Sequence, residues 1–598
     1  MLLSQNPKTK NIIILSIVVA FAIQALMIIV FYGHNIPLSD DGDQIFLAYL
    51  MSTDNEISFE DFSEVHTGHV PIFMRLLTIP FLLAFSFTTI PFLYFQFFII
   101  CSAIFLTYLL IKKTNKGSLW LLIPISGLIF SPLAEKTLTW SGGGIMQTLP
   151  FMLGIAMIYL LYDKLTYTKI SLGLVIAGIV MFTNTVGILF WPIMLLSFIK
   201  KENRNPKFLA IWVVGGILLS LLFVYGLNQS ECDFGRCDND MSDSFSQMFN
   251  SEKIYVYFLS LVSTIFRLKF NEFYIITGII LLSIFVTTFL YSIFNKKSTS
   301  YLIPWCQYGL MGLIFILLLS LGRFHLWSGE SVQIDLYYIT IINFLPISII
   351  VLFYENLNMW KKNSTKNRKT IFNIILVVFF ISLLVMFIPT YIIGWKIAED
   401  SYNWKTTELS GCLLLPASTK HYETFEYCTE FHIPEYMMTH HTKNHQEFAP
   451  EIWNYFLKND YNIFSNKEFN ESALNDAYDF TQRWNNSSNM SAIDVEFERI
   501  NFNELESYSV VPKITGPQIS LEGVIRSASN VNFNDLFLFL NDQPFAKINS
   551  VVNTSESTFS WKLVFLSEYV SDGCHEFSLG LIDNSISYRS SQTLEFCK

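Results

Sequence analysis

Long apolar runs alternate with short polar segments over most of the chain, and the pattern then stops. Apolar runs that can cross the roughly 30 Å hydrocarbon core of a bilayer as helices recur from Asn11 to Ile393. We expect about eleven membrane-spanning helices, over residues 11–32, 90–111, 119–131, 147–162, 170–182, 186–199, 208–227, 271–294, 301–321, 331–354 and 370–393. The chain after Lys396 is polar, which predicts an extramembrane C-terminal part.

Four of the expected helices are short. Between Leu119 and Ile199 each apolar run holds about 13 to 16 residues, fewer than the roughly 20 that a full crossing needs. Helices that end within the membrane are tolerated where they line protein or a water-filled cavity. The connections at 132–144 and at Asn184-Thr185 would then border a cavity that opens to the outside. Tilted packing or a locally thinned bilayer is the alternative.

Two further apolar segments are expected to lie at the membrane surface or to re-enter it. Residues 70–89 carry Arg75 between Pro71 and Pro80, and residues 253–270 form a similar segment. Counting the first as a crossing would place Lys112 outside, against the tendency of basic residues to stay in the cytoplasm. An interfacial or re-entrant helix fits better.

The pattern changes to a two-residue alternation near the C-terminus. Apolar and polar residues alternate in Leu536–Leu540, Phe545–Ile548 and Phe559–Phe565, with turn residues between them. Short strands of this kind predict a β-sandwich. The expected fold is therefore a polytopic α-helical membrane domain over 1–395, a mixed α+β region over 396–509, and a β-sandwich over 510–598.

Composition and charge agree with this organisation. The 598 residues are 52% hydrophobic and their mean hydropathy is +0.40, which excludes a single soluble core. The net charge of -10 argues against a nucleic-acid partner, which would need a clustered basic face. Basic clusters occur in alternate loops, at 8–10, 112–116, 164–169, 200–207, 296–297 and 361–369. They predict a cytoplasmic N-terminus, an external C-terminus, and a first span that stays as an anchor.

The cysteines favour the same orientation. Three pairs that are close in sequence fall in segments expected outside, whereas Cys101 and Cys306 fall within spans. Disulfides in an oxidising compartment explain this arrangement. The predicted disulfides join Cys232 to Cys237, Cys412 to Cys428, and Cys574 to Cys597. Zinc ligation is the alternative for any one pair.

An acidic cluster follows the first span. Asp40, Asp41 and Asp43 would serve transfer to a hydroxyl acceptor if one acts as general base and another orients it or binds a metal. The alternative is a solvated helix start capped by Ser39 or Asp40.

Histidine and arginine follow about 25 residues later. His66 and His69 could bind a metal together with an aspartate such as Asp43, contact a phosphate, or be structural. Arg75 offers a guanidinium that matches phosphate oxygens, or it extends to lipid head groups.

A second polar group lies at the outer end of the ninth expected span. Arg323, His325 and Tyr337 occur there among other aromatic residues, which could form an ordinary aromatic belt. The expected topology places Arg323 on the same side of the membrane as Asp40 and His69. A phosphate held between Arg75 and Arg323 would fit this placement.

Together these residues resemble the GT-C superfamily of membrane glycosyltransferases, which take a sugar from a polyprenyl-phosphate carrier. The likeness lies in Asp40-Asp41 after the first span, the amphipathic external loop, the short central spans and the external C-terminal domain. His66-Thr67-Gly68-His69 through Arg75, with Leu321-Gly322-Arg323 and Tyr337, is similar to a bacterial group in this class, although Val70 and Leu336 stand where that group has arginine.

The resemblance implies a bacterial inner-membrane enzyme with a periplasmic C-terminus. It implies that Asp40 or Asp41 deprotonates a hydroxyl of an envelope glycan, such as O-antigen or a lipid-linked oligosaccharide. Polyprenyl phosphate then leaves with inversion at the sugar, and Arg75, Arg323 and the histidines, or a divalent metal, stabilise it. No nucleotide-binding glycine-rich loop is evident, which agrees with a lipid-linked donor.

Other functions remain open from the sequence. A glycan polymerase or ligase would use similar residues at the outer face. A transporter would show charges near the middle of its spans and repeated halves, and neither is evident. A non-catalytic scaffold would use its β-sandwich to bind glycans.

Overall fold

The computed structural model describes the helical part of the chain and the strands near its C-terminus. The described ranges are 7–35, 41–53, 59–63, 69–114, 118–228, 252–264, 271–295, 299–323, 338–362, 366–404, 459, 490–502, 518–526, 536–540, 543–547, 551–555, 558–566, 574–583, 586–590 and 594–597. The chain divides into two compact units. The first comprises Met1–His34, Leu47–Phe85 and Thr89–Asp400, and the second comprises Asn35–Phe46, Ser86–Thr88 and Ser401–Lys598.

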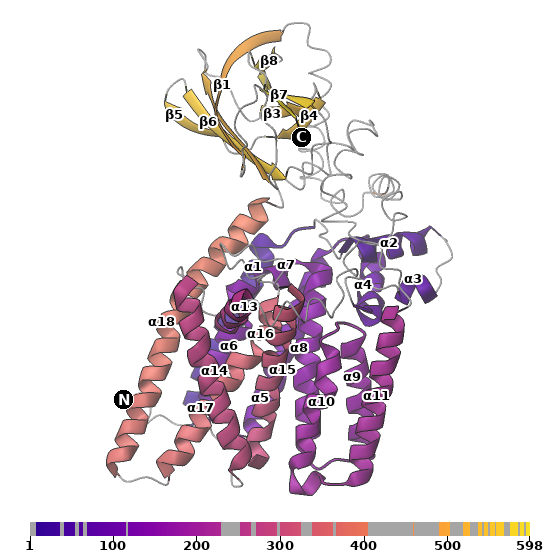
Figure 1. The fold of residues 1–598 in the computed structure, drawn as a ribbon, viewed down its shortest axis with the longest axis vertical. Helices are drawn as coiled ribbons and strands as arrows, with labels where there is room; N and C mark the ends of the chain where they lie inside the picture. The colour runs from indigo at the N-terminus through magenta and orange to yellow at the C-terminus, as the bar shows by residue number, and fades with distance from the viewer. Residues whose placement is uncertain are drawn as a thin grey trace. The chain divides into compact units, whose positions relative to one another are not determined.

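Helices make up nearly all of the first unit (Figure 1). The α-helices are α1 (Pro7–Tyr32), α2 (Asp41–Ser52), α3 (Phe59–Ser63), α4 (Ile72–Ala84), α5 (Ile90–Thr114), α6 (Leu122–Ile129), α7 (Glu135–Thr139), α8 (Ser141–Tyr162), α9 (Tyr167–Met181), α10 (Gly187–Ile193), α11 (Pro206–Asn228), α13 (Glu252–Ser263), α14 (Asn271–Phe294), α15 (Thr299–Arg323), α16 (Ile339–Ile342), α17 (Phe344–Lys362) and α18 (Lys366–Trp404). Short 3-10 helices are η2 (Leu119–Leu121), η3 (Pro132–Ala134), η4 (Met194–Ile199) and η5 (Lys201–Asn203).

The protein is a helical membrane protein with several spans. Within the described residues, eight helices are long and apolar enough to cross a membrane, and a bent pair of helices makes a ninth candidate. Two shorter apolar helices, Tyr167–Met181 and Gly187–Ile199, coincide with the expected spans 170–182 and 186–199. The total of about eleven spans stays a prediction.

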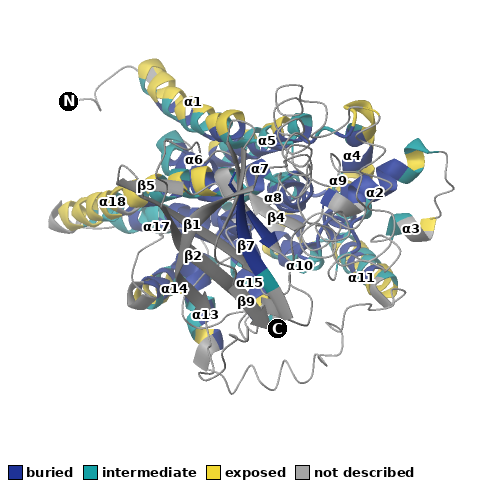
Figure 2. Cartoon of the chain, turned by 90° about the horizontal axis from the view of Figure 1, so that it is seen from above, coloured by how far each residue is buried: buried dark blue, intermediate teal, exposed yellow. Residues whose placement is uncertain are grey.

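The exposed surface of the bundle is apolar where lipid would touch it. Only 6% of the apolar window of α18 and 28% of that of α1 is buried, and both helices carry rows of exposed residues (Figure 2). The window of Ile339–Lys362, which includes α17, is 83% buried, and those of α8 and α15 are 72% buried. These helices form the core, while α1, α11 and α18 face the lipid.

Polar side chains join the core helices. Trp305 Nε1 on α15 donates to Thr114 Oγ1 at the end of α5 over 3.1 Å. Asn356 Nδ2 on α17 donates to the Thr288 carbonyl and to Ser292 Oγ on α14, each over 3.1 Å. Hydrogen bonds of this kind replace a hydrophobic driving force that lipid does not provide between helices.

The start of α8 differs from the prediction. We expected a short helix over 147–162 preceded by a glycine-rich loop, but α8 begins at Ser141 and has 22 residues. The glycines are needed for packing rather than for a turn, since a Cβ at Gly143 would lie 2.6 Å from the Trp140 ring. The expectation of a short helix was wrong here, although α9, with 15 residues, is short as predicted.

A break in the chain separates α6 from α7. The helices Leu119–Ile129 and Pro132–Thr139 meet at 41°, because Pro132 has no backbone N–H and restricts the residue before it. The Leu128 carbonyl accepts from Asn343 Nδ2 over 3.0 Å, and the Gly127 carbonyl accepts from the Tyr391 hydroxyl over 2.6 Å. Neighbouring helices therefore satisfy carbonyls that the break leaves without helical partners.

The strands of the second unit form one connected sheet. They are β1 (Met490–Phe502), β2 (Gln518–Arg526), β3 (Leu536–Leu540), β4 (Gln543–Lys547), β5 (Val551–Ser555), β6 (Thr558–Leu566), β7 (Cys574–Asp583), β8 (Ile586–Ser590) and β9 (Leu594–Cys597). Their order is β4-β3-β7-β8-β1-β2-β6-β5, with β9 paired to β7. The predicted strands at 536–540, 545–548 and 559–565 coincide with β3, β4 and β6.

The long strand β1 joins the two halves of the sheet. Its first residues, Met490–Ile493, pair in parallel with β8, and the stretch from Asp494 to Phe502 pairs antiparallel with β2. This strand begins before residue 510, so the sheet extends about 20 residues beyond the predicted domain boundary. Phe577, Ser578 and Leu579 are consecutive and all buried. Because neighbouring strand residues face opposite sides, both faces of β7 are covered.

Candidate functional site

His69, one of the predicted site residues, lies toward one end of the bundle. We call the end at which α8 begins the upper end, and the end at which it finishes, at Tyr162, the lower end (Figure 1). Helix α9 runs back from Tyr167 near the lower end, so the turn after Met181 is at the upper end. Asn184 Nδ2 in this turn donates to the Met146 carbonyl of α8 over 3.0 Å.

His69 is held by this turn. Its Nδ1 lies 2.6 Å from Thr185 Oγ1 and accepts the backbone N–H of Thr185 over 3.1 Å. A backbone N–H can only donate, so Nδ1 carries no proton and the neutral ring has its proton on Nε2. The turn therefore fixes both the orientation and the tautomer of His69, and Nε2–H is the donor that the ring can offer.

The segment that carries His69 continues into α4, which packs on the same hairpin. Phe73 N in the first turn of α4 donates to the Phe182 carbonyl over 3.0 Å. Val70 is buried against Met181 and Phe223, and Met74 is buried with Ile145 and Met146 of α8, among others. The prediction of a non-spanning helix over this segment agrees with the 13 residues of α4.

The hairpin beneath His69 is shorter than a bilayer. Helix α9 has 15 residues, a rise of about 22 Å at 1.5 Å per residue. Gly187–Ile193 and the 3-10 helix Met194–Ile199 give about the same length. The hydrocarbon core is roughly 30 Å thick, so a hairpin anchored at the lower surface ends below the upper one. His69 would then lie at the depth of lipid head groups or acyl chains.

Arg75 is buried rather than exposed to head groups. Its side chain is 0% exposed, and NH1 donates to the Phe62 carbonyl of α3 over 2.9 Å. This contact joins α3 to α4. A guanidinium has five N–H donors, so a phosphate role for Arg75 is compatible with the contact and stays a prediction.

Asp41 is the first residue of α2 and is 3% exposed. Gln44 and the stretch Ile45–Tyr49 after it are also buried, so the helix start is not solvated at Asp41, while capping by Ser39 or Asp40 lies outside the described residues. The amides of a first helical turn stabilise a carboxylate. Asp41 is thus a buried carboxylate at the start of a helix in the segment that follows the first span.

A second buried carboxylate was not among the predicted catalytic residues. Glu135 begins α7 at the upper end and is 1% exposed, and its Oε2 lies 3.3 Å from Thr139 Oγ1. The sequence signal was present, because the 132–144 connection was expected to border the cavity. Ionisable residues within a membrane bundle are expensive and usually functional. Thr185 was likewise recognised only as part of a turn.

Several predicted site residues lie outside the described part of the chain. They are Asp40, His66, His325 and Tyr337. Arg323 ends α15 and Asp43 lies in α2, but their side chains are outside the described set. The roles assigned to these six residues therefore stay predictions.

Two of the three predicted disulfides also fall outside the described residues. Cys232 and Cys237 would form the first of these bonds, and Cys412 and Cys428 would form the second. Neither bond has support from the described part of the chain, so both stay predictions.

The remaining cysteines can be placed on their elements. Cys574 and Cys597 are direct register partners of β7 and β9, an arrangement that suits the third predicted disulfide. Cys101 on α5 and Cys306 on α15 are free thiols, in agreement with their expected place within membrane spans.

Metal binding was one interpretation of His66, His69 and Asp43. In the described ranges, no group of three or more His, Cys, Asp or Glu residues could hold a metal ion. His69 Nδ1 already accepts hydrogen bonds from Thr185, so only Nε2 could ligate a metal. Because His66 and the side chain of Asp43 lie outside the described residues, the metal interpretation stays a prediction.

Comparison with models of known protein families gives no match, and comparison with curated proteins gives none either.

Proposed function

We propose that this protein is a membrane glycosyltransferase that moves a sugar from a polyprenyl-phosphate donor to a hydroxyl of a cell-envelope glycan. The observation that supports it most is the ring of His69, which Thr185 fixes in the tautomer with its proton on Nε2, beside a hairpin whose helices are shorter than a bilayer core is thick. A hydrogen-bond donor at the depth where such a hairpin ends suits the phosphate of a sugar carried on a lipid chain.

In this proposal Asp41 is the general base. Its carboxylate removes the proton of the acceptor hydroxyl, and the resulting oxygen attacks the anomeric carbon. The bond from that carbon to the phosphate oxygen breaks, and polyprenyl phosphate leaves with the electron pair. A single displacement inverts the configuration of the sugar. The burial of Asp41 supports this assignment, because excluding water strengthens the interactions of a reacting charge.

The leaving phosphate needs positive charge and hydrogen-bond donors. His69 Nε2–H would donate to a phosphate oxygen, and Arg75 and Arg323 would supply positive charge. Asp40, His66, His325 and Tyr337 remain parts of the proposed site, and a divalent metal held by Asp43 and the histidines remains the alternative source of charge.

The proposal also includes the finer topology. About eleven spans, a cytoplasmic N-terminus, and a periplasmic C-terminal β-sandwich in a bacterial inner membrane place Asp41 and His69 on the periplasmic side. The uneven placement of basic residues supports this orientation.

The test is transfer of sugar by the purified full-length protein from a polyprenyl-phosphate sugar to an envelope glycan. Asp41→Asn should lower kcat by more than 100-fold, in line with the loss of a general base, without changing the thermal unfolding temperature by more than a few degrees. Asp400→Asn is the matched control, because Asp400 is an exposed acid on α18. Full transfer by Asp41→Asn protein would refute the catalytic role.

The same assay separates the alternatives. Elongation of a lipid-linked glycan without a monosaccharide donor would show a polymerase or ligase. Glycan binding that survives in Asp41→Asn protein, with no turnover in the wild type, would show a scaffold. Movement of the lipid-linked sugar across a vesicle membrane without transfer would show a transporter.

A further inference from the structure

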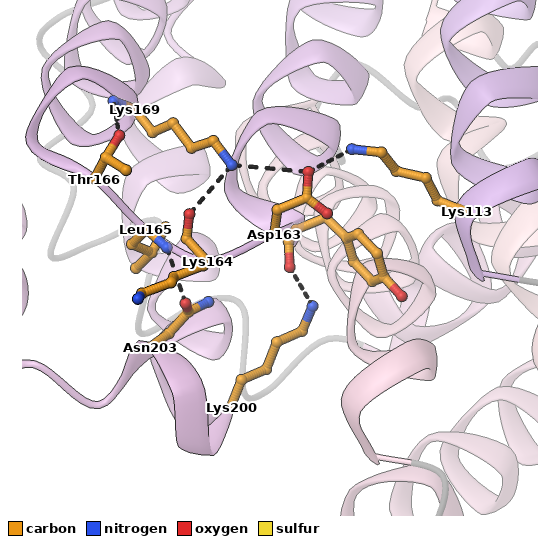
Figure 3. A network of polar contacts seen from close by, with 9 residues as sticks. Lys113, Asp163, Lys164, Leu165, Thr166, Lys169, Lys200 and Asn203 are labelled. Carbon is orange, nitrogen blue, oxygen red and sulfur yellow. Dashed lines mark hydrogen bonds and ion pairs between the residues drawn. The ribbon is translucent and has the colours of Figure 1, made fainter.

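A cluster of lysines lies at the lower end of the bundle, far along α8 from the candidate site. Lys113 at the end of α5, Lys169 in the first turn of α9 and Lys200 after η4 converge on the turn between α8 and α9 (Figure 3). We call these residues, with Asp163 in the turn, the lysine cluster. Its members come from four separate segments, so the fold and not the sequence brings them together.

One carboxylate, that of Asp163, forms ion pairs with two of these ammonium groups. Asp163 Oδ2 lies 2.6 Å from Lys113 Nζ and 3.7 Å from Lys169 Nζ. Lys169 Nζ also donates to the Lys164 carbonyl over 3.2 Å. Burial opposes the ionisation of Asp163, but the hydrogen bond from Lys113 and the nearby lysine charges hold its pKa below the usual value. Asp163 is therefore ionised, and it balances only one positive charge.

Lys200 is a third ammonium, and it is buried. It is 5% exposed, and its Nζ donates to the Tyr162 carbonyl over 2.5 Å and lies 3.6 Å from the centre of the Tyr162 ring. In the part of the chain that the structure describes, no carboxylate lies within salt-bridge distance of this atom. Burial, with repulsion from Lys113 and Lys169, lowers its pKa to about 8 despite the opposing charges of Glu202 and Asp163.

The cluster lies at the level of the membrane interface. Tyr162 is the last residue of a candidate span, and Lys113 Nζ lies 4.0 Å from the centre of the Tyr159 ring. Tyrosine and lysine side chains gather where lipid head groups meet the hydrocarbon. The side chains of Lys113, Lys169 and Asp163 are 30%, 26% and 48% exposed, so the cluster is open on one side.

We propose that the lysine cluster binds the phosphate of an anionic membrane lipid. The cluster has more positive than negative charge, its open side is at head-group depth, and a lipid phosphate is the anion present there in quantity. A phosphate oxygen would accept hydrogen bonds from Lys113 and Lys169, which have N–H groups beyond those that Asp163 uses. This site is separate from the proposed catalytic site and does not depend on it.

A purely structural ion pair is the competing explanation, and charge variants separate the two. In a structural pair, Asp163→Asn and Lys113→Gln both remove the same contact and do the same damage. In a lipid site they act in opposite directions, because Asp163→Asn removes a competing anion and Lys113→Gln removes a donor. Lys361→Gln is the matched control, since Lys361 is a partly exposed lysine whose Nζ donates to the Asn373 side chain over 2.8 Å.

The experiment measures lipid binding by native mass spectrometry and by thermal unfolding of the full-length protein in neutral detergent. The probes are phosphatidylglycerol, phosphatidylcholine and inorganic phosphate. We expect saturable binding of phosphatidylglycerol that raises the unfolding temperature, and about fivefold weaker binding for Lys113→Gln and for Lys169→Gln, which corresponds to roughly 1 kcal/mol per lysine. Asp163→Asn should bind phosphatidylglycerol at least as tightly as the wild type, and Lys361→Gln should bind it equally.

Three results would overturn the proposal. Equal weakening by Asp163→Asn and Lys113→Gln would show a structural ion pair only. Equal weakening by Lys361→Gln would show unspecific attraction to surface charge. Inorganic phosphate that displaces phosphatidylglycerol and stabilises the protein as well would identify a soluble phosphate as the ligand.

Discussion

Replacing Lys200 with methionine tests whether the charged ammonium group of Lys200 is buried at the lower end of the helical bundle. Methionine keeps the length of the aliphatic chain and removes the ammonium, together with its hydrogen bond to the Tyr162 carbonyl. The surrounding protein lowers the pKa of Lys200 from 10.5 to about 8, and each pKa unit corresponds to about 1.4 kcal/mol. The buried charge therefore costs the wild type about 3 kcal/mol of folding free energy near neutral pH.

The direction in which the free energy of unfolding changes with pH follows from the number of protons that each state binds. Below about pH 8 the folded and unfolded states both hold the Lys200 proton, so the cost of burying the charge is fully present. Between about pH 8 and 10.5 the unfolded state binds more protons than the folded state, and the free energy of unfolding rises with pH. For these pKa values, the wild type gains about 1 kcal/mol relative to Lys200→Met between pH 7 and 9.

The assay is reversible unfolding in mixed micelles followed by tryptophan fluorescence, at several pH values between 7 and 9. The comparison of interest is the difference between wild type and Lys200→Met, because titrations that both proteins share cancel. Lys361→Met, on a partly exposed lysine, is the control for removing a surface ammonium. A difference between wild type and Lys200→Met that stays constant over this pH range would refute the buried-charge argument.

Three further changes test other parts of the structure. Thr185→Val should keep the fold but remove the hydroxyl contact to His69, lowering kcat of the proposed transfer several-fold with KM little changed. Thr185→Ser keeps a hydroxyl and should restore kcat. Equal loss of kcat in both variants would contradict a positioning role. Gly143→Ala should lower the free energy of unfolding by about 1–3 kcal/mol, because its Cβ would lie 2.6 Å from the Trp140 ring. Gly178→Ala, whose Cβ would lie 3.4 Å from Leu219, should be tolerated. Equal stability of the two variants would show that Trp140 moves freely. Asn356→Leu should lower the free energy of unfolding by about 1–2 kcal/mol, because the Thr288 carbonyl and Ser292 hydroxyl of α14 lose the hydrogen bonds from Asn356 Nδ2. An unchanged unfolding curve would contradict this prediction.

The sequence indicated the elements better than the contacts between them. Apolar runs predicted helices because a bilayer requires every backbone polar group to be satisfied within the segment, and alternation predicted β3, β4 and β6 because strand residues face opposite sides. The glycines at 142–144 misled the prediction, since in α8 Gly143 packs closely against Trp140 and Gly144 against Gln96 and the Thr137 carbonyl. A run of glycines alone does not distinguish a turn from a close helix contact.

The site was predictable only in part for the same reason. His69 and Asp41 became candidates because ionisable residues cluster in the segment after the first span and because that segment resembles a known family. Thr185 lies 116 residues after His69, and Lys200 and Lys113 are also far apart in sequence. Their proximity follows from the way the helices return through the bundle, which hydropathy does not specify.

The two ends of the bundle are linked through the short hairpin of α9 and α10. Its lower end carries Lys169 and leads to Lys200, and its upper turn carries Thr185, which holds His69. A hairpin of about 22 Å is shorter than an unthinned core of roughly 30 Å, so in such a bilayer only one of its ends lies at a surface. The charged end is the costlier one to move into hydrocarbon, so the lysines stay at the lower head groups and the upper turn lies deeper. If the proposed transfer is correct, charges at the lower end of this hairpin would set the depth at which His69 meets a lipid-linked phosphate.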